Sequence, residues 1–316
     1  VKLENLKLTW SRPIVTEGEI VRFGKGETTV RIDPGLFPCR IEKGVLFAVG
    51  DGWEYRAALA MTFSGRTHEI VETTTDFTVK GAARANADGT VTFAQDFSAG
   101  GKVKPGDILI LRPRSRPYPA VFVYHAKDTL LEDVAIHTAW GMGLVAQMSE
   151  NVTWRGTRTA LDRTNGCFPP EGSKQVVTLH ADASHFSNVK GSVTVENGLF
   201  ETMLDDAVNV HSTCLGIVKV VDPKTIRCRY MHRQATGFGV FNPGDRLRFI
   251  RGKTLENDAE TTVVAVAAHG HEEMTLTLRD ALPGGIAAGD AVENADYQPS
   301  VVCRGNVIRN NRARGV

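Results

Sequence analysis

The sequence predicts an all-β protein in which a parallel β-helix carries two inserted small β-barrels. Helix signals are nearly absent, and short β-rich runs bounded by Gly, Asn, Asp and Pro recur along the 316 residues. These runs form two kinds of segment, which alternate along the chain. In addition, two adjacent carboxylates follow a third acid at an interval of about one helical coil, so this fold would place all three on one wall.

The first kind of segment consists of brief strands that turn at polar corners. In these segments an Asn or Asp is followed directly by an inward-facing aliphatic residue. The pattern occurs at 3–8, 131–136, 149–154, 186–189 and 304–311. Asn tolerates the left-handed backbone conformation and can bond its own backbone, so the pattern is typical of the corners of a β-solenoid. We predict β-helix coils at 1–13, 119–212 and 301–316.

The second kind of segment consists of longer strands joined by hairpin-like turns. They occupy 14–118 and 213–300, and each block contains a related Pro-Gly-Asp phrase, at 104–109 and at 242–247. A Pro-Gly-Asp turn that opens a strand suits the edge of a barrel. We therefore predict one small β-barrel in each block, inserted into the β-helix.

Three aspartates are the main candidates for chemistry. Asp205 and Asp206 are adjacent, and Asp182 lies 23 residues earlier, while stacked coils are roughly 4.7–4.9 Å apart. Side chains alternate with a period of two, which predicts that Asp182, Asp205, Asn209 and His211 project outward into a shared groove. Crowded carboxylates hold protons unequally, which suits general acid and base catalysis. This reasoning favours Asp182 as the acid and the adjacent pair as the base, and it leaves the reverse open.

Five further side chains are candidates for binding a substrate. Asn209 and His211 follow the acidic pair, and His185 follows the lone acid. Arg312 and Arg314 lie two apart, so on a strand they would share a face and reach the groove, where guanidinium groups suit hydroxyls or carboxylates. Each has a structural alternative: a stacked corner Asn, a solvated histidine, or an arginine on a solvated coil surface.

The composition excludes several classes of protein. A formal net charge of +1 provides no basic field for nucleic acid, and no apolar run approaches the ~18 residues of a membrane span. The five cysteines are scattered without a Cys-x-x-Cys pair, and His269 and His271 fit a solvated hairpin turn, so we expect no metal and no cofactor. The chain begins at Val1 without an initiator Met or a signal peptide, so we expect a fragment of a longer polypeptide.

Four segments together carry a family resemblance. They are the acidic run at 205–211, the opening at 3–13, the phrase at 141–147 and the closing at 310–315. These segments resemble glycoside hydrolase family 110, whose members are bacterial exo-acting α-1,3-galactosidases. The resemblance implies a right-handed β-helix with inserted barrels, inversion at the anomeric carbon, and removal of terminal α-1,3-linked galactose from glycans of the blood-group B or linear α-galactosyl type. It also implies catalytic roles for Asp182, Asp205 and Asp206 and a secreted or periplasmic location, and it allows a homodimer.

The chemistry of inverting hydrolysis fits such a cluster of acids. It needs a protonated carboxylic acid for the departing oxygen and a carboxylate that activates water, about 6.5–9.5 Å apart, and it needs no metal or cofactor. Two other classes stay open. A polygalacturonase-like β-helix hydrolase also pairs a lone Asp with a later Asp-Asp but would call for a basic groove, and a non-catalytic carbohydrate-binding β-helix would carry the acids as solvated corners. Trp140 and Trp154 would either stack on galactose or fill a core and seal an insertion.

Overall fold

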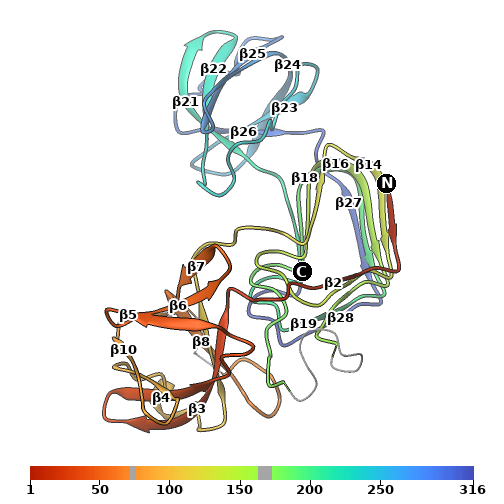
Figure 1. Cartoon of the computed structure of the whole chain (residues 1–316). Coiled ribbons are helices and arrows are strands. Elements are labelled where there is room, and N and C mark those ends of the chain that lie inside the picture. The colour runs from red at the N-terminus through yellow and green to blue at the C-terminus, as the bar shows by residue number, and fades with distance from the viewer. Residues whose placement is uncertain (72–75, 163–172) are drawn as a thin grey trace.

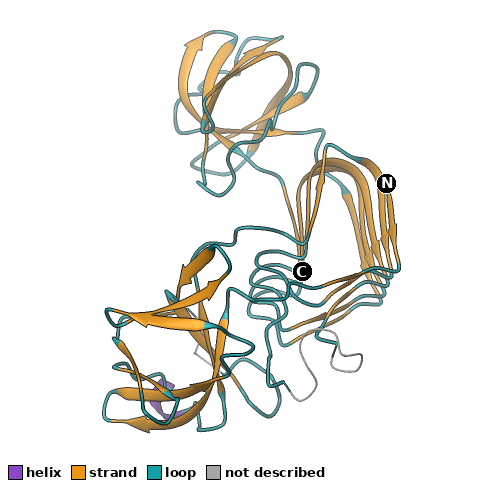
Figure 2. Cartoon of the chain, viewed as in Figure 1, coloured by secondary structure: helices purple, strands orange, loops and turns teal. Residues whose placement is uncertain are grey.

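The structure is a computed structural model that describes residues 1–71, 76–162 and 173–316. In these residues the chain is all-β, with 28 strands, one short 3-10 turn and no α-helix. A stack of parallel strands carries both ends of the chain, and two antiparallel bodies project from it (Figures 1 and 2). Both bodies are insertions, because the chain leaves the stack after β2 (Lys7–Leu8) and β20 (Val208–His211) and returns at β13 (Val121–Tyr124) and β27 (Ser300–Arg304).

The stack contains two parallel sheets, which we call sheet A and sheet B. Sheet A consists of β1 (Lys2–Glu4), β13, β14 (Lys127–Glu132), β16 (Leu144–Arg155), β18 (Ser184–Glu196), β20 and β27. Sheet B consists of β2, β15 (Ala135–Ile136), β17 (Arg158–Thr159), β19 (Leu199–Glu201) and β28 (Val307–Arg309). Every assigned strand pair in these sheets is parallel. Successive passes of the chain stay in register, as the row Val152, Val193 and Val301 shows.

Five stacked corners join sheet A to sheet B. Asn5, Asp133, Gly156, Asn197 and Gly305 occupy them, all with φ between 53° and 66°. This left-handed conformation suits Asn, Asp and Gly, which is the physical reason the polar corner pattern predicts these turns.

The same pattern of a polar residue before an aliphatic one also occurs inside two long strands of sheet A. At 149–154 and 186–189 we expected corners between brief strands, but β16 and β18 continue through both segments. Asn151 and Asn188 still have φ of 53°. A left-handed Asn inside a paired strand bends that strand without ending it, so this part of the prediction is wrong.

The core of the stack lies between sheets A and B. Leu131, Trp154 and Val195 are fully buried there, and the ring of Trp154 packs against Phe200 with centroids 5.3 Å apart. Trp154 therefore fills the core, which is one of the two roles expected for it.

The first inserted body contains two antiparallel sheets and η1 (Ala99–Gly101). Its strands are β3 (Thr16–Gly24), β4 (Glu27–Ile32), β5 (Cys39–Glu42), β6 (Val45–Gly50), β7 (Trp53–Arg56), β8 (Leu59–Phe63), β9 (Phe77–Thr78), β10 (Ala83–Ala85), β11 (Val91–Phe93) and β12 (Ile108–Arg112). Seven of them pair in the order β10-β11-β4-β3-β12-β8-β9, and β5, β6 and β7 form the second sheet. Phe93, Phe97 and Leu109 lie fully buried in its core.

The second inserted body is a closed antiparallel barrel. Its strands, in the order in which they pair, are β21 (Leu215–Asp222), β22 (Thr225–Tyr230), β25 (Glu273–Leu278), β24 (Asn257–His269), β23 (Arg246–Ile250) and β26 (Ala291–Asn294). Closure leaves no free sheet edge. Phe249, Leu276 and Val292 fill the interior.

The two Pro-Gly-Asp phrases form the same turn, one in each inserted body. Asp107 Oδ2 accepts a hydrogen bond of 2.8 Å from the backbone N–H of Lys104, and Asp245 Oδ2 accepts one of 2.8 Å from that of Asn242. The glycines between them have φ of 95° and 99°. Each turn leads directly into a strand, β12 or β23, so the prediction that these phrases open strands is confirmed.

A cluster of aromatic rings fastens the first inserted body to the stack. Trp140 packs against Trp10 at 4.9 Å and against Trp53 at 4.8 Å between ring centroids. Its indole N–H donates to the backbone oxygen of Arg12 at 2.6 Å. Trp140 therefore seals an insertion, which is the structural role expected for it.

Candidate active site

The three aspartates lie at the ends of sheet A strands. Asp182 precedes β18, and Asp205 and Asp206 precede β20. Because Ser184 and Val208 are partners in the parallel register, Asp182 and Asp206 lie opposite each other, and the Ala183 N–H donates to the backbone oxygen of Asp206 at 2.9 Å. One coil here is 24 residues, so Asp206 lies opposite Asp182 and Asp205 lies one residue before that position, and the acids come together as we expected from the spacing.

Asp206 is held by donors on both of its oxygens. The backbone N–H and Nε of Arg314 donate to Oδ1 at 2.9 and 3.1 Å. Arg314 Nη2 and Asn209 Nδ2 donate to Oδ2 at 2.8 and 3.2 Å. A carboxylate that accepts four hydrogen bonds, including a guanidinium fork, is fixed in orientation.

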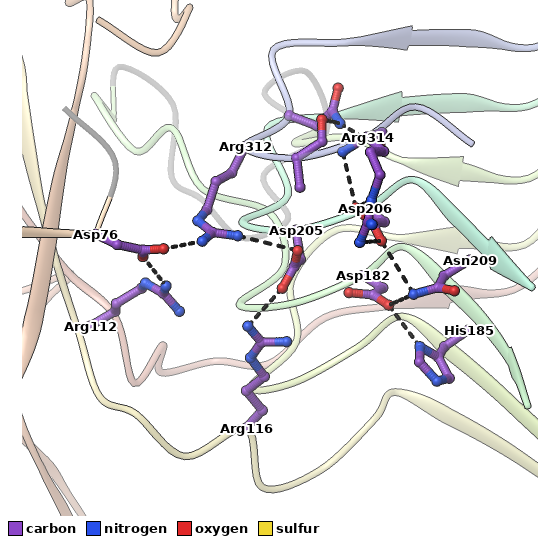
Figure 3. A network of polar contacts seen from close by, with 12 residues as sticks. Asp76, Arg112, Arg116, Asp182, His185, Asp205, Asp206, Asn209, Arg312 and Arg314 are labelled. Carbon is purple, nitrogen blue, oxygen red and sulfur yellow. Dashed lines mark hydrogen bonds and ion pairs between the residues drawn. The ribbon is translucent and has the colours of Figure 1, made fainter. Parts of the chain in front are cut away.

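Asp182 is held through one oxygen only. Its Oδ2 accepts from His185 Nδ1 at 2.7 Å and, at a longer 3.5 Å, from Asn209 Nδ2. Among the residues that the structure describes, no donor reaches Oδ1, which points toward Asp205 (Figure 3). Asn209 thus joins Asp182 to Asp206 and leaves one oxygen of Asp182 open to the site.

Asp205 lies between two arginines. Arg116 Nη2 is 2.6 Å from its Oδ2, and Arg312 Nη1 donates to Oδ1 at 3.2 Å. Burial raises the pKa of Asp205, and the nearby charges of Asp182 and Asp206 raise it further, while the two arginines only partly oppose this. Asp205 is therefore the acid of the cluster that holds a proton more readily than an ordinary aspartate.

The first inserted body contributes charged groups to this site. Asp76, just before β9, forms ion pairs with both Arg112 and Arg312 (Figure 3). Burial alone would raise the pKa of Asp76, but hydrogen bonds from Arg312 and Arg112 outweigh it and hold that pKa below its usual value. Arg312 therefore bridges Asp76 and Asp205, so its position depends on both parts of the molecule.

Sequence reasoning did not find Asp76, Arg112 or Arg116. A signal existed for the arginines, because the run Arg-Pro-Arg-Ser-Arg-Pro at 112–117 follows β12, where the chain returns from the insertion to the stack. No signal marked Asp76, since its partner Arg312 is 236 residues away in the sequence.

Two histidines extend the network from Asp182. His185 Nε2 lies 2.8 Å from His211 Nε2, and His211 Nδ1 lies 3.1 Å from the backbone oxygen of Ser212. Burial lowers the pKa of His211. His180, which also flanks Asp182, is completely buried, and burial followed by repulsion from Arg112 and Arg116 lowers its pKa to about 3, so it is a neutral structural group.

The structure corrects the expectation that Asp182 projects into an open groove. Asp182 is only 3 % exposed, as is Asp206, because His185, Asn209 and Arg314 cover them, and the side chain of Asp205 is 14 % exposed. They face a polar network on the outside of the stack, and the hydrophobic core lies elsewhere.

The two C-terminal arginines also differ from expectation. Arg312 and Arg314 reach the acids, as predicted, but neither lies on a strand, and they contact different aspartates. The strand-face argument for their joint position is therefore wrong, although the placement beside the acids is found.

The described residues contain neither a cluster of metal ligands nor a helix that could span a membrane. Across 1–71, 76–162 and 173–316, no group of three or more His, Cys, Asp or Glu side chains is arranged to hold a metal ion. In the same ranges no helix has the length and apolarity to cross a bilayer.

Two family models match the inserted bodies. One, described as GLAA-B beta-barrel domain I, matches residues 16–109, and the other, GLAA-B beta-barrel domain II, matches residues 225–292. The first match covers the body that supplies Asp76. The second covers most of the closed barrel.

Curated relatives match the whole chain. An alpha-1,3-galactosidase B of Akkermansia muciniphila is 42 % identical over 315 residues, which are 100 % of this chain and 38 % of the relative. An alpha-1,3-galactosidase B of Bacteroides fragilis is 34 % identical over 99 % of this chain and 53 % of its own length. An alpha-1,3-galactosidase A of Bacteroides fragilis is 29 % identical over 100 % of this chain and 51 % of its own length. The chain thus spans 38 % to 53 % of the length of these relatives.

Proposed function

We propose that this chain, which belongs to glycoside hydrolase family 110, carries the acidic site of an exo-acting α-1,3-galactosidase. The observation that carries the proposal is the unequal treatment of three neighbouring aspartates. Burial raises the pKa of Asp205, which two arginines also contact. Asp206 accepts four hydrogen bonds, and Asp182 accepts through Oδ2 alone among the described residues. One carboxyl group that favours its proton beside two that are held by donors is an arrangement that general acid and base catalysis can use.

In this proposal Asp205 is the general acid. Its raised pKa favours the protonated form, which protonates the departing glycosidic oxygen. Arg116 and Arg312 then stabilise the carboxylate left after proton transfer, because both already contact its oxygens. The sequence favoured Asp182 as the acid with the adjacent pair as the base and left the reverse open, and the contacts support an exchange of roles between Asp182 and Asp205 alone.

Asp182 and Asp206 together activate the water. Asn209 donates to both carboxylates and so keeps them side by side. The open Oδ1 of Asp182 accepts the proton of the attacking water, while Asp206, whose oxygens already accept four bonds, orients the site. Attack from the face opposite the leaving group inverts the anomeric carbon.

The proposal also covers the sugar that is removed and the architecture of the stack. The names of the relatives point to terminal α-1,3-linked galactose as the group removed. We infer that the two parallel sheets are walls of a parallel β-helix, since the chain passes from sheet A to sheet B at five stacked corners, and its right-handed sense is taken from the family resemblance. The secreted or periplasmic location and the homodimer stay predictions of the family resemblance.

The test is hydrolysis of an α-1,3-galactosyl disaccharide followed by proton NMR. The expected first product is β-galactose, which later mutarotates to the α form. Initial release of α-galactose would contradict inversion. Release of sugar from polygalacturonate instead would support the polygalacturonase-like class, and saturable binding without release would support the non-catalytic class.

A substrate whose leaving group needs no proton distinguishes the general acid from the general base. Asp205→Asn should lose about a hundredfold or more in kcat on the disaccharide. It should keep much of its rate on 2,4-dinitrophenyl α-galactoside, because that leaving group departs without a proton. Asp182→Asn should be slow on both, and azide, which attacks without losing a proton, should restore turnover as β-galactosyl azide. The opposite pattern would return the acid role to Asp182.

A further inference from the structure

The contacts from Asp182 to Ser212 require a fixed number of hydrogens. The line runs from Asp182 Oδ2 to His185 Nδ1 at 2.7 Å, from His185 Nε2 to His211 Nε2 at 2.8 Å, and from His211 Nδ1 to the Ser212 backbone oxygen at 3.1 Å. Each contact needs one hydrogen between its two atoms. Two neutral imidazoles carry only two, so Asp182 and the histidines together hold one additional proton.

That additional proton belongs to a ring and not to the carboxyl group. An ordinary imidazole binds a proton more tightly than an ordinary aspartate, with reference values of about 6.5 and 3.9.

The ring that holds the proton is His185. Its Nδ1 lies 2.7 Å from the Asp182 carboxylate, whereas the contacts of His211 are to the His185 ring and to a neutral backbone oxygen. His185 then donates from both nitrogens, and neutral His211 accepts at Nε2 and donates from Nδ1 to Ser212.

The surroundings of the pair supply no other close counter-charge in the described part of the chain. The residues opposite His185 in the register are Val145 of β16 and Asn209 of β20, both uncharged. Beyond Asn209 lie Asp206 and its partner Arg314, which neutralise each other. Ser187 lies opposite His211.

We propose that His185 is held as an imidazolium between Asp182 and the lone pair of His211, so that Asp182 stays ionised and oriented as the water-activating base. His211 is then a positioning residue that acts through His185, where the sequence had suggested a contact with substrate. The role in catalysis rests on the proposed function, but the protonation state does not.

Two substitutions of His211 separate this role from a packing role. His211→Phe keeps a flat ring but offers no lone pair to His185 Nε2. His211→Gln offers a carbonyl oxygen and is the matched control. In His211→Phe, His185 should lose the proton on Nε2 at neutral pH, because no acceptor faces that atom, whereas His211→Gln should keep it.

The measurement is ¹⁵N NMR of the histidine-labelled protein across pH. At neutral pH we expect both nitrogens of His185 to be protonated and His211 to be a neutral ring protonated at Nδ1. Two neutral rings at neutral pH, or the same protonation of His185 in the two variants, would overturn the proposal. This readout needs no turnover, so it stays decisive if the protein proves not to be a galactosidase.

Kinetics test the catalytic part on the disaccharide. His211→Phe should lower kcat about tenfold with little change in KM, and His211→Gln should recover most of the loss. A rise in KM at unchanged kcat in both variants would show that His211 binds substrate, and would reject its role as a positioning residue even if the NMR result is as expected.

Discussion

At the scale of single residues, the site is built from arginine–carboxylate pairs of unequal exposure. Arg314 is 76 % exposed in its side chain, yet the carboxylate that it holds, Asp206, is 4 % exposed. A surface arginine that covers a buried acid shields its charge from water and fixes its orientation. Arg304 and Glu196 form a similar pair elsewhere on the stack, with side-chain exposures of 73 % and 5 %.

That similarity makes Arg304 the matched control for Arg314. We expect Arg314→Ala to lower kcat at least about tenfold, because Asp206 keeps only Asn209 and one backbone donor. Arg304→Ala should change the fold stability by a similar small amount and leave turnover unchanged. Equal kinetic losses in the two variants would mean that the effect of Arg314 is structural.

The raised pKa of Asp205 makes a prediction about pH. A general acid works only while it is protonated, so kcat/KM should fall as the pH rises through the pKa of Asp205. Arg116→Gln removes one of the charges that favour the ionised form. The alkaline limb of the profile should therefore move to higher pH in that variant. A shift to lower pH, or no shift, would contradict Asp205 as the acid.

The sequence could predict the site residues that lie on adjacent coils of the stack, but not those that the first inserted body and its exit segment contribute. Asp182, Asp205 and Asp206 follow from strand alternation and a coil-length interval, which are local properties. Asp76 and Arg116 reach Asp205 and its partners only because an insertion folds back onto the stack. No period in the sequence encodes that return.

At the scale of elements, two corners of the stack require glycine for two reasons at once, the backbone conformation and the lack of space for a Cβ. A Cβ at Gly156 would lie 2.4 Å from Asp133 Oδ1, the corner residue of the preceding coil, and its φ is 62°. Gly305 stands in the same relation to Asn197, at 2.4 Å and 66°. From Asp133 onward, glycine therefore alternates with a corner residue whose side chain fills the space beside it. The need for glycine at a given corner depends on the residue in the preceding coil, so it cannot be predicted from one coil alone.

We expect Gly156→Ala to destabilise the fold by about 2–3 kcal/mol, since it adds a steric clash to the strain of a left-handed alanine. Gly26, with φ of 72° and nothing within 4 Å of a Cβ, is the control that carries the strain alone. Gly26→Ala should cost about 1 kcal/mol. Urea denaturation of both variants measures the difference, and equal losses would show that the contact with Asp133 gives way freely.

At the scale of the whole molecule, the first inserted body is part of the site. It supplies Asp76 and Arg112, the last residue of β12, and the chain that leaves it supplies Arg116 (Figures 1 and 3). The aromatic cluster around Trp140 holds that body against the stack. The longest-range contact of the network, between Asp76 and Arg312, is therefore a measure of how well the two parts are assembled.

Asp76→Asn tests that assembly. Arg112 is 3 % exposed, so the loss of its counter-charge should lower the free energy of unfolding by about 1–3 kcal/mol. Because the folded pKa of Asp76 lies below its usual value, its stabilising effect is complete above the unfolded pKa and is lost as the pH falls through the folded one. The stability difference between the protein and Asp76→Asn should thus shrink below about pH 4.

The kinetic effect of Asp76 should pass through Arg312. In a double-mutant cycle, Asp76→Asn and Arg312→Gln should each lower kcat, and the double variant should be about as slow as the Arg312→Gln single variant. This follows because Asp76 reaches Asp205 only by orienting Arg312 within the described network. Additive losses would mean that the inserted body affects catalysis by another route, such as the position of Arg116 at its exit.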